Sequence, residues 1–263
     1  MDREYPLAMR IYPFLLLLIF IGSNAQQPNI KKVAGAKQAV FSFIFDDLNT
    51  TDSLVKSIFD EFGFQPSFAI TTNKLNPKTA PLYKSYAEEG ISILSHSHTH
   101  PKMNNSSVLD KESLLMELKD SKERIESYGI PVHGFVTPNS YMRPEFLSLL
   151  ETEYDYAFTN NHNDLYDISV DKRHLARYGI ESNISTSDHS IEKIRSRIDQ
   201  AITNNELLVL YGHAMPSTYL DDLGKPRVTA NDLRAILGYL KSKRDNNECL
   251  VLTADLAMEA YYK

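Results

Sequence analysis

The chain has 263 residues, of which 42% are hydrophobic and 24% are charged, as in ordinary soluble globular proteins. This length suits one large domain or two small ones. A net charge of −6 without clusters of basic residues argues against nucleic-acid binding. The single cysteine, Cys249, excludes a disulfide within the chain, so the core must stabilise the fold.

Residues 1–25 have the pattern of a secretory signal peptide. Arg3 and Arg10 precede the apolar run 11–21, and small residues follow it at the positions of a cleavage site. A retained membrane anchor is the alternative, but the apolar run is short for a bilayer. We therefore expect a secreted or periplasmic protein that keeps no stable membrane anchor after cleavage, with a flexible polar lead-in over 26–38.

Residues 39–263 alternate between apolar runs and amphipathic segments, which predict strands and helices. Strands are predicted over 39–45, 67–70, 91–94, 132–136, 154–158, 207–211 and 250–253, with a further extended segment over 175–180. Helices are predicted over 52–62, 78–89, 110–128, 144–150, 190–203 and 229–242, and at the C-terminus. About seven alternations indicate an α/β fold with mainly parallel strands and outer helices. A barrel is favoured over an open sheet because no Gly-rich phosphate loop follows the first strand.

Polar residues gather at the ends of the predicted strands. Asp46 and Asp47 follow the first strand, a histidine-rich stretch follows the third, 138–141 follows the fourth, and His213 follows the run 207–211. In a barrel of parallel strands, functional residues meet at the carboxyl ends of the strands. The positions of these residues therefore predict one shared site.

The histidine-rich stretch Ser95–His100 contains His96, His98 and His100. Neutral imidazole is a common metal ligand, so such a cluster indicates a metal or catalytic site. In an extended segment all three rings share one face, whereas in a helical turn only His96 and His100 converge. Both geometries are open at this point.

The adjacent carboxylates of Asp46 and Asp47 diverge, so one can bind a metal while the other faces a water molecule. An exposed turn that begins the next helix is the alternative. One aspartate and two histidines form a three-ligand site with open positions, the pattern of a catalytic divalent ion. Such an ion activates water and polarises a carbonyl, while the second aspartate and a histidine transfer protons.

Three ordered motifs resemble those of the polysaccharide deacetylases, carbohydrate esterase family 4, which share the chitooligosaccharide deacetylase homology domain. They are Ile44-Phe45-Asp46-Asp47, His96-Ser97-His98-Thr99-His100 and Tyr211-Gly212-His213. The resemblance extends over 39–263 and implies a distorted (β/α)7-type barrel. It also implies hydrolytic removal of N- or O-linked acetyl groups from an acetylated glycan, either a polymer or an oligosaccharide.

The resemblance also implies roles for individual residues. Asp47, His96 and His100 would hold a divalent metal, usually Zn²⁺, with Co²⁺ or Ni²⁺ as alternatives. Asp46 would be the general base and His213 the general acid. His98 falls on a variable position of its motif and is not expected to be a ligand.

The chain departs from the family pattern at the motif that often reads Arg-Pro-Pro-Tyr. Here the chain reads Val136-Thr137-Pro138-Asn139, so the arginine is missing, and Arg143 or Arg177 is left as a substitute. The family's tryptophan is also absent, because the chain has no Trp. The backbone N–H of Asn139 is expected to contribute to an oxyanion hole. The residues expected to contact substrate are Pro138, Asn139, Tyr141 and Tyr211.

Two alternatives remain beside the deacetylase. The departures from the motifs are compatible with a weakly active or inactive relative that binds a glycan. A different metallohydrolase barrel would use His96 and His98 as a His-x-His pair. Hydrolysis by a serine nucleophile is disfavoured, since the chain lacks a Gly-x-Ser-x-Gly elbow.

Overall fold

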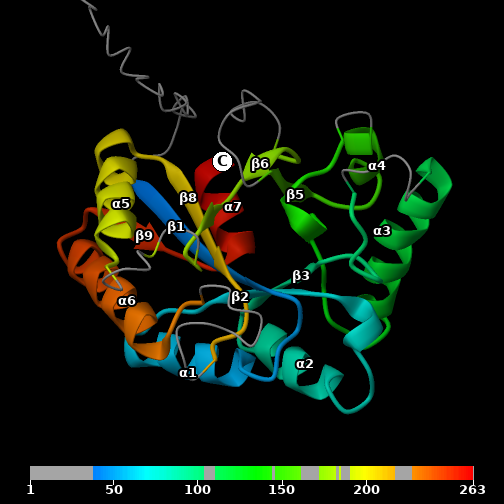
Figure 1. Ribbon diagram of the computed structural model, residues 1–263, viewed down its shortest axis with the longest axis horizontal. Helices are drawn as coiled ribbons and strands as arrows, with labels where there is room; N and C mark the ends of the chain where they lie inside the picture. The colour runs from blue at the N-terminus through cyan, green and yellow to red at the C-terminus, as the bar shows by residue number, and fades with distance from the viewer. Residues whose placement is uncertain are drawn as a thin grey trace, which may run out of the picture.

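A computed structural model (Figure 1) describes residues 38–103, 110–143, 146–160, 172–181, 184, 190–216 and 227–262. The strands are β1 (Ala39–Asp46), β2 (Ser67–Ile70), β3 (Ser92–Ser95), β4 (Gly134–Val136), β5 (Tyr156–Asn160), β6 (Leu175–Ala176), β7 (Tyr178–Gly179), β8 (Leu207–Gly212) and β9 (Cys249–Val251). The α-helices are α1 (Asp52–Glu61), α2 (Ala80–Glu88), α3 (Lys111–Glu126), α4 (Leu147–Leu150), α5 (Glu192–Asn204), α6 (Ala230–Asp245) and α7 (Ala254–Tyr262). Two 3-10 helices, η1 (Thr72–Lys74) and η2 (Pro138–Ser140), follow β2 and β4.

The strands and helices follow the predicted alternation. Local hydrogen bonds and backbone conformation determine where several of the helices begin or end. The Asp110 side chain accepts from the backbone N–H of Ser113 at the start of α3. Thr229 and Asp232 form a reciprocal capping box at the start of α6. Gly63 adopts a positive φ just after α1, a conformation in which other residues are strained.

The strands form one parallel sheet that nearly closes into a barrel. Its order is β6-β5-β4-β3-β2-β1-β8-β7, and β9 pairs with β1 beside β2. The two ends of this order, β6 and β7, are consecutive in the chain and are separated only by Arg177. The backbone at Arg177 therefore links the two edges of the sheet. This arrangement confirms the predicted distorted (β/α)7-type barrel.

Alternate residues of each strand serve two different cores. Phe41, Phe43 and Phe45 of β1 face the outer helices, where Phe43 and Phe45 pack edge-to-face on Phe59 of α1. A second cluster fills the barrel with side chains from successive strands, listed as Ile44, Ala69, Leu94, Val136, Phe158, Leu175 and Val209. Asp46, two residues beyond Ile44, thus lies on the strand face that points into the barrel.

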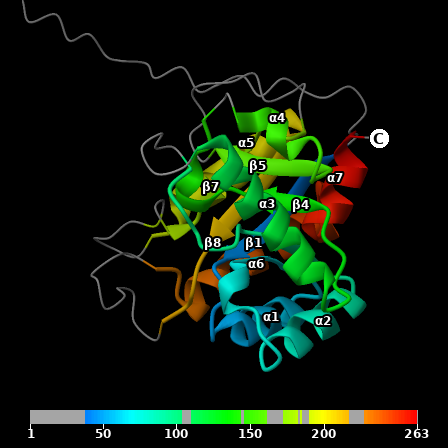
Figure 2. The same ribbon diagram turned by 90° about the vertical axis from the view of Figure 1, so that its right-hand side faces the viewer.

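Helix α7 closes the amino-terminal end of the barrel. Its first backbone N–H groups, at Ala254 and Asp255, donate to the hydroxyl oxygens of Ser67 and Ser92, the first residues of β2 and β3. Ala254 and Met258 also belong to the cluster inside the barrel. Figure 2 shows α7 (red) on the right-hand side of the barrel. The carboxyl ends of the strands are left for a site.

The predicted signal peptide, residues 1–25, and nearly all of the lead-in lie outside the described residues. Within the described part of the chain, no helix combines the length and the apolar character needed to cross a membrane.

Candidate active site

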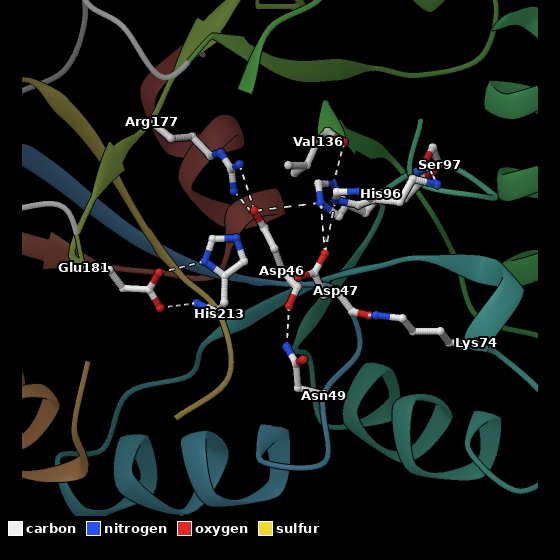
Figure 3. Close-up of polar contacts among 12 residues, drawn as sticks. Asp46, Asp47, Asn49, Lys74, His96, Ser97, Val136, Arg177, Glu181 and His213 are labelled. Carbon is white, nitrogen blue, oxygen red and sulfur yellow. Dashed lines mark hydrogen bonds and ion pairs between the residues drawn. The ribbon is translucent and has the colours of Figure 1, made fainter. Parts of the chain in front are cut away.

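The carboxyl ends of four distant parts of the sheet bring charged side chains together. Asp46 ends β1, His96 follows β3, Arg177 lies between β6 and β7, and His213 follows β8 (Figure 3). Asp46, His96 and Arg177 are each at most 3% exposed. Charged and polar groups buried to this degree need partners. Arg177 pairs with Asp46, and His96 is hydrogen-bonded to the Val136 carbonyl of the neighbouring strand β4.

A sharp turn after β1 separates the two adjacent carboxylates. Asp47 and Leu48 have left-handed φ values of 89° and 62°, which are uncommon for residues other than glycine. The turn is held by the Asn49 side chain, which donates to the Asp46 carbonyl at 2.6 Å, and by Lys74, whose Nζ donates to the Asp47 carbonyl at 2.8 Å. As a result, the Asp46 and Asp47 carboxylates face different partners.

Asp47, His96 and His100 form a group suited to a metal ion. Asp47 Oδ1 lies 3.3 Å from His100 Nε2 and 3.6 Å from His96 Nε2. One ligand atom from each residue lies within 4.8 Å of the others, and no second such group occurs among the described residues. A carboxylate with two imidazoles and open positions is a donor set for a catalytic divalent ion such as Zn²⁺.

The protonation of these side chains fits the same role. His96 Nδ1 lies 2.8 Å from the Val136 carbonyl oxygen, which can only accept, so Nδ1 carries the hydrogen and Nε2 offers a lone pair to the site. Burial lowers the pKa of His96 to about 4, which keeps the ring neutral near pH 7. Burial raises the pKa of the Asp47 carboxyl, but the hydrogen bond with His100 and the nearby histidine charges outweigh it and leave this pKa below its ordinary value.

The histidine-rich stretch turns after β3 instead of continuing as a strand. Ser97 and His100 have left-handed φ values of 65° and 61°, and the Ser97 hydroxyl accepts from the His100 N–H at 3.0 Å. The His96 and His100 rings then lie with centroids 4.9 Å apart. His98 is directed elsewhere, with Nδ1 2.9 Å from the Thr72 hydroxyl. The stretch is therefore neither extended nor a helical turn, but His96 and His100 converge as a helical turn would have placed them, and the group does not include His98.

Arg177 is the arginine that contacts Asp46. Its guanidinium donates to both carboxylate oxygens, at 2.8 and 2.9 Å, and lies over the Tyr211 ring, 4.3 Å from the centroid. The other candidate, Arg143, instead stacks over Phe146 at 4.0 Å. Asp46 is thus contacted by an arginine from the closure of the barrel, whereas the motif at 136–139 contains no arginine.

His213 is held by Glu181, a residue that the sequence did not single out. Glu181 accepts from the His213 backbone N–H at 3.0 Å and from its Nδ1 at 2.8 Å, and Arg227 donates to the same carboxylate at 2.9 Å. Burial lowers the pKa of His213, but the hydrogen bond and charge of Glu181 more than offset this and raise it above its ordinary value. The strand-end rule could have found Glu181, which closely follows the predicted extended segment 175–180.

The residues expected to contact substrate lie near the same end of the barrel. Pro138 is buried and Asn139 is exposed, at the start of η2, just after the carbonyl of Val136 that orients His96. Asn139 has a left-handed φ of 55°. Tyr141 and Tyr211 are half-buried, and one face of Tyr211 is covered by Arg177.

Comparison with known proteins agrees with the sequence motifs. Residues 34–159 match a family model described as polysaccharide deacetylase. A structure of a putative polysaccharide deacetylase from Mycobacterium smegmatis shares 16% identity with this chain, covers 89% of it and 93% of its own chain, and has a TM-score of 0.61. No curated protein gives a significant match. The family model covers the first two of the three motifs and confirms the resemblance to the polysaccharide deacetylases.

Two further solved structures have the same fold. A family 4 acetyl xylan esterase from Clostridium thermocellum, in complex with a cobalt ion, is 17% identical and covers 84% of this chain and 90% of its own, with a TM-score of 0.56. A peptidoglycan deacetylase from Bacillus subtilis is 16% identical and covers 86% and 92%, with a TM-score of 0.52. Because these identities are low, they establish the fold and leave the substrate open.

Proposed function

We propose that this chain, a member of the polysaccharide deacetylase family, is a secreted or periplasmic, metal-dependent hydrolase that removes N- or O-linked acetyl groups from a carbohydrate polymer or oligosaccharide. The observation that carries the proposal is the group of Asp47, His96 and His100, which lies beside a buried carboxylate and across from a histidine held by a glutamate.

Asp47, His96 and His100 would hold the divalent ion. When bound there, such an ion supplies a Lewis acid that polarises the acetyl carbonyl and makes water more acidic. The fit rests on the donor set and on the orientation of His96, whose Nδ1–H is taken up by the Val136 carbonyl so that Nε2 faces the group.

Asp46 is the proposed general base. Its Oδ2 lies 4.0 Å from His96 Nε2, so the carboxylate borders the proposed metal site without being one of its three members. Arg177 donates to both carboxylate oxygens and so fixes the orientation of the group that would accept a proton from water. A proton taken up at Asp46 therefore stays in a fixed position next to the reacting acetyl group.

His213 is the proposed general acid. Glu181 accepts the hydrogen of Nδ1, which leaves Nε2 to donate a proton to the departing sugar amine or hydroxyl. The raised pKa of His213 keeps the ring protonated to higher pH, as an acid requires. Pro138, Asn139, Tyr141 and Tyr211 are the proposed sugar contacts, and the Asn139 N–H is the proposed oxyanion donor.

Acetate release tests the proposal. The protein would be stripped with a chelator, reconstituted separately with Zn²⁺, Co²⁺ or Ni²⁺, and incubated with N-acetylated and O-acetylated oligosaccharides. We expect release only after a metal is restored. Measurable glycan binding without acetate release in any metal form would instead support the inactive, glycan-binding relative. Export would be tested by sequencing the mature N-terminus, which we expect at Gln26.

A further inference from the structure

The turn between His96 and His100 is held from outside the proposed metal site by a helix. Glu117, on α3, directs its carboxylate at the backbone of the turn. Its Oε2 accepts from the N–H groups of His98 and Thr99, both at 2.8 Å, and its Oε1 accepts from the Thr99 hydroxyl. Glu117 therefore provides partners for two consecutive backbone donors that lie between the proposed ligands.

The other side of the same turn is held by η1. The backbone N–H groups of Thr72 and Asn73 donate to the carbonyl oxygens of Ser97 and His98, at 3.1 and 3.0 Å. The turn is thus clamped, with its carbonyl groups bonded to η1 and its N–H groups bonded to α3. The clamp matters because Ser97 and His100 hold left-handed φ values that non-glycine residues rarely adopt.

We propose that Glu117 is a positioning residue that holds the turn in its metal-binding form before the metal arrives. Without it, His98 and Thr99 would lose their acceptor, and the backbone at His100 could relax out of its strained conformation. Part of the free energy of metal binding would then be spent on restoring the turn, so the affinity of the site for the metal would be lower. This inference rests on the metal site of the proposed function.

The test compares Glu117→Ala with Glu117→Gln. A glutamine oxygen can accept from both backbone N–H groups while its amide donates to the Thr99 hydroxyl, so Gln preserves the geometry without the charge. We expect Zn²⁺ affinity, measured by competition with a chromophoric chelator, to fall about 10-fold or more in Glu117→Ala and to stay near the wild-type value in Glu117→Gln. Glu123→Ala, an exposed site on the same helix paired with Lys119, is the matched control and should have no effect.

The visible absorption spectrum of the Co²⁺ form provides a second readout, since it reports ligand geometry and not stability. We expect an altered spectrum for Glu117→Ala and an unchanged one for Glu117→Gln. If Glu117→Ala does not fold by circular dichroism, Glu117→Asp replaces it, because the shorter chain cannot reach both N–H groups.

Three results would each overturn a different part of this proposal or of the function on which it rests. Wild-type affinity and spectrum in the Ala or Asp variant would overturn the positioning role of Glu117. A Gln variant as weak as Ala would overturn the geometric explanation, because the charge would then be responsible. A wild-type protein that binds no Zn²⁺ or Co²⁺ would overturn the metal-dependent function itself.

Discussion

Arg177 and Asp46 form a bidentate, buried ion pair across 131 residues of sequence. Both side chains are almost inaccessible to water, so each charge depends on the other for solvation. Asp46 ends the central strand β1, and Arg177 is the single residue between β6 and β7. The pair therefore couples the closure of the barrel to the proposed catalytic base.

Removing Arg177 should damage both stability and activity. We expect Arg177→Met to lower the free energy of unfolding by about 3–5 kcal/mol, because it leaves a buried carboxylate without a partner. Adding Asp46→Asn should recover part of this loss, since the unpaired charge is then gone. Denaturant unfolding of the two single variants and the double variant measures the recovery.

The conservative variant Arg177→Lys separates charge from geometry. An ammonium group lacks the fixed planar fork with which the guanidinium orients both oxygens of Asp46, so we expect kcat to fall on the order of 100-fold while the stability loss is smaller than for Arg177→Met. Arg143→Lys, at the position that the motif left as the alternative, is the control. Equal loss of kcat in both variants would contradict the assignment of Arg177.

The sequence predicted the fold and three motifs because both depend on strong local patterns. The run Ala39–Asp46 is apolar except for Ser42 and its last residue, and the residues that follow such strands must meet at one end of a parallel barrel. Asp46, Asp47, His96, His100 and His213 could be found in this way.

The contacts of Arg177 with Asp46 and of Glu117 with the histidine turn could not be found in the same way. Arg177 is one of two arginines that the sequence leaves open, and its contact with Asp46 depends on the closure of the whole barrel between β6 and β7. Glu117 resembles any other charged residue on the outer face of a helix, because it contacts backbone atoms that have no sequence signature. Polar contacts between residues far apart in the sequence could therefore be identified only in the structure.

Asp46 and Asp47 should respond differently to substitution. We expect Asp47→Ala to weaken Zn²⁺ binding at least about 100-fold, because it removes one of three ligands. Asp46→Asn should keep the metal and lose about 100-fold or more in kcat, since an amide cannot accept the proton. Metal content and acetate release measured on the same samples test this division, which equal metal loss in both variants would contradict.

The pKa of His213 should depend on Glu181. The hydrogen bond and charge of Glu181 raise this pKa against the effect of burial. A general acid acts only while protonated, so activity falls as pH rises through its pKa. We expect Glu181→Gln to move the alkaline limb of the kcat profile towards lower pH. Asp155→Asn, which alters the exposed pair of Asp155 with His133, is the control and should leave the limb in place.

Asp52 should make the folded state less stable as pH rises, independently of the proposed chemistry. Burial raises the pKa of this carboxyl to about 6, against partial opposition from its hydrogen bonds with Tyr83 and Asn49. The folded state holds the proton of Asp52 more tightly than the unfolded chain does, so the protonated carboxyl contributes to the stability of the fold. This contribution is fully present below about pH 4 and is lost as pH rises through about 6. The loss amounts to about 3 kcal/mol, from a shift of about two units.

Asp52→Asn isolates this effect, because both hydrogen bonds reach a single oxygen of Asp52 and an amide oxygen can accept both. We expect the variant to gain stability relative to wild type between pH 4 and pH 7.5 by about 3 kcal/mol, measured by urea unfolding at both values. Asp60→Asn, which alters an exposed ion pair on the same helix α1, is the control and should change the free energy of unfolding little. A difference between Asp52→Asn and wild type that stays constant with pH would mean that folding does not raise the pKa of Asp52, so its burial would not be controlling its protonation.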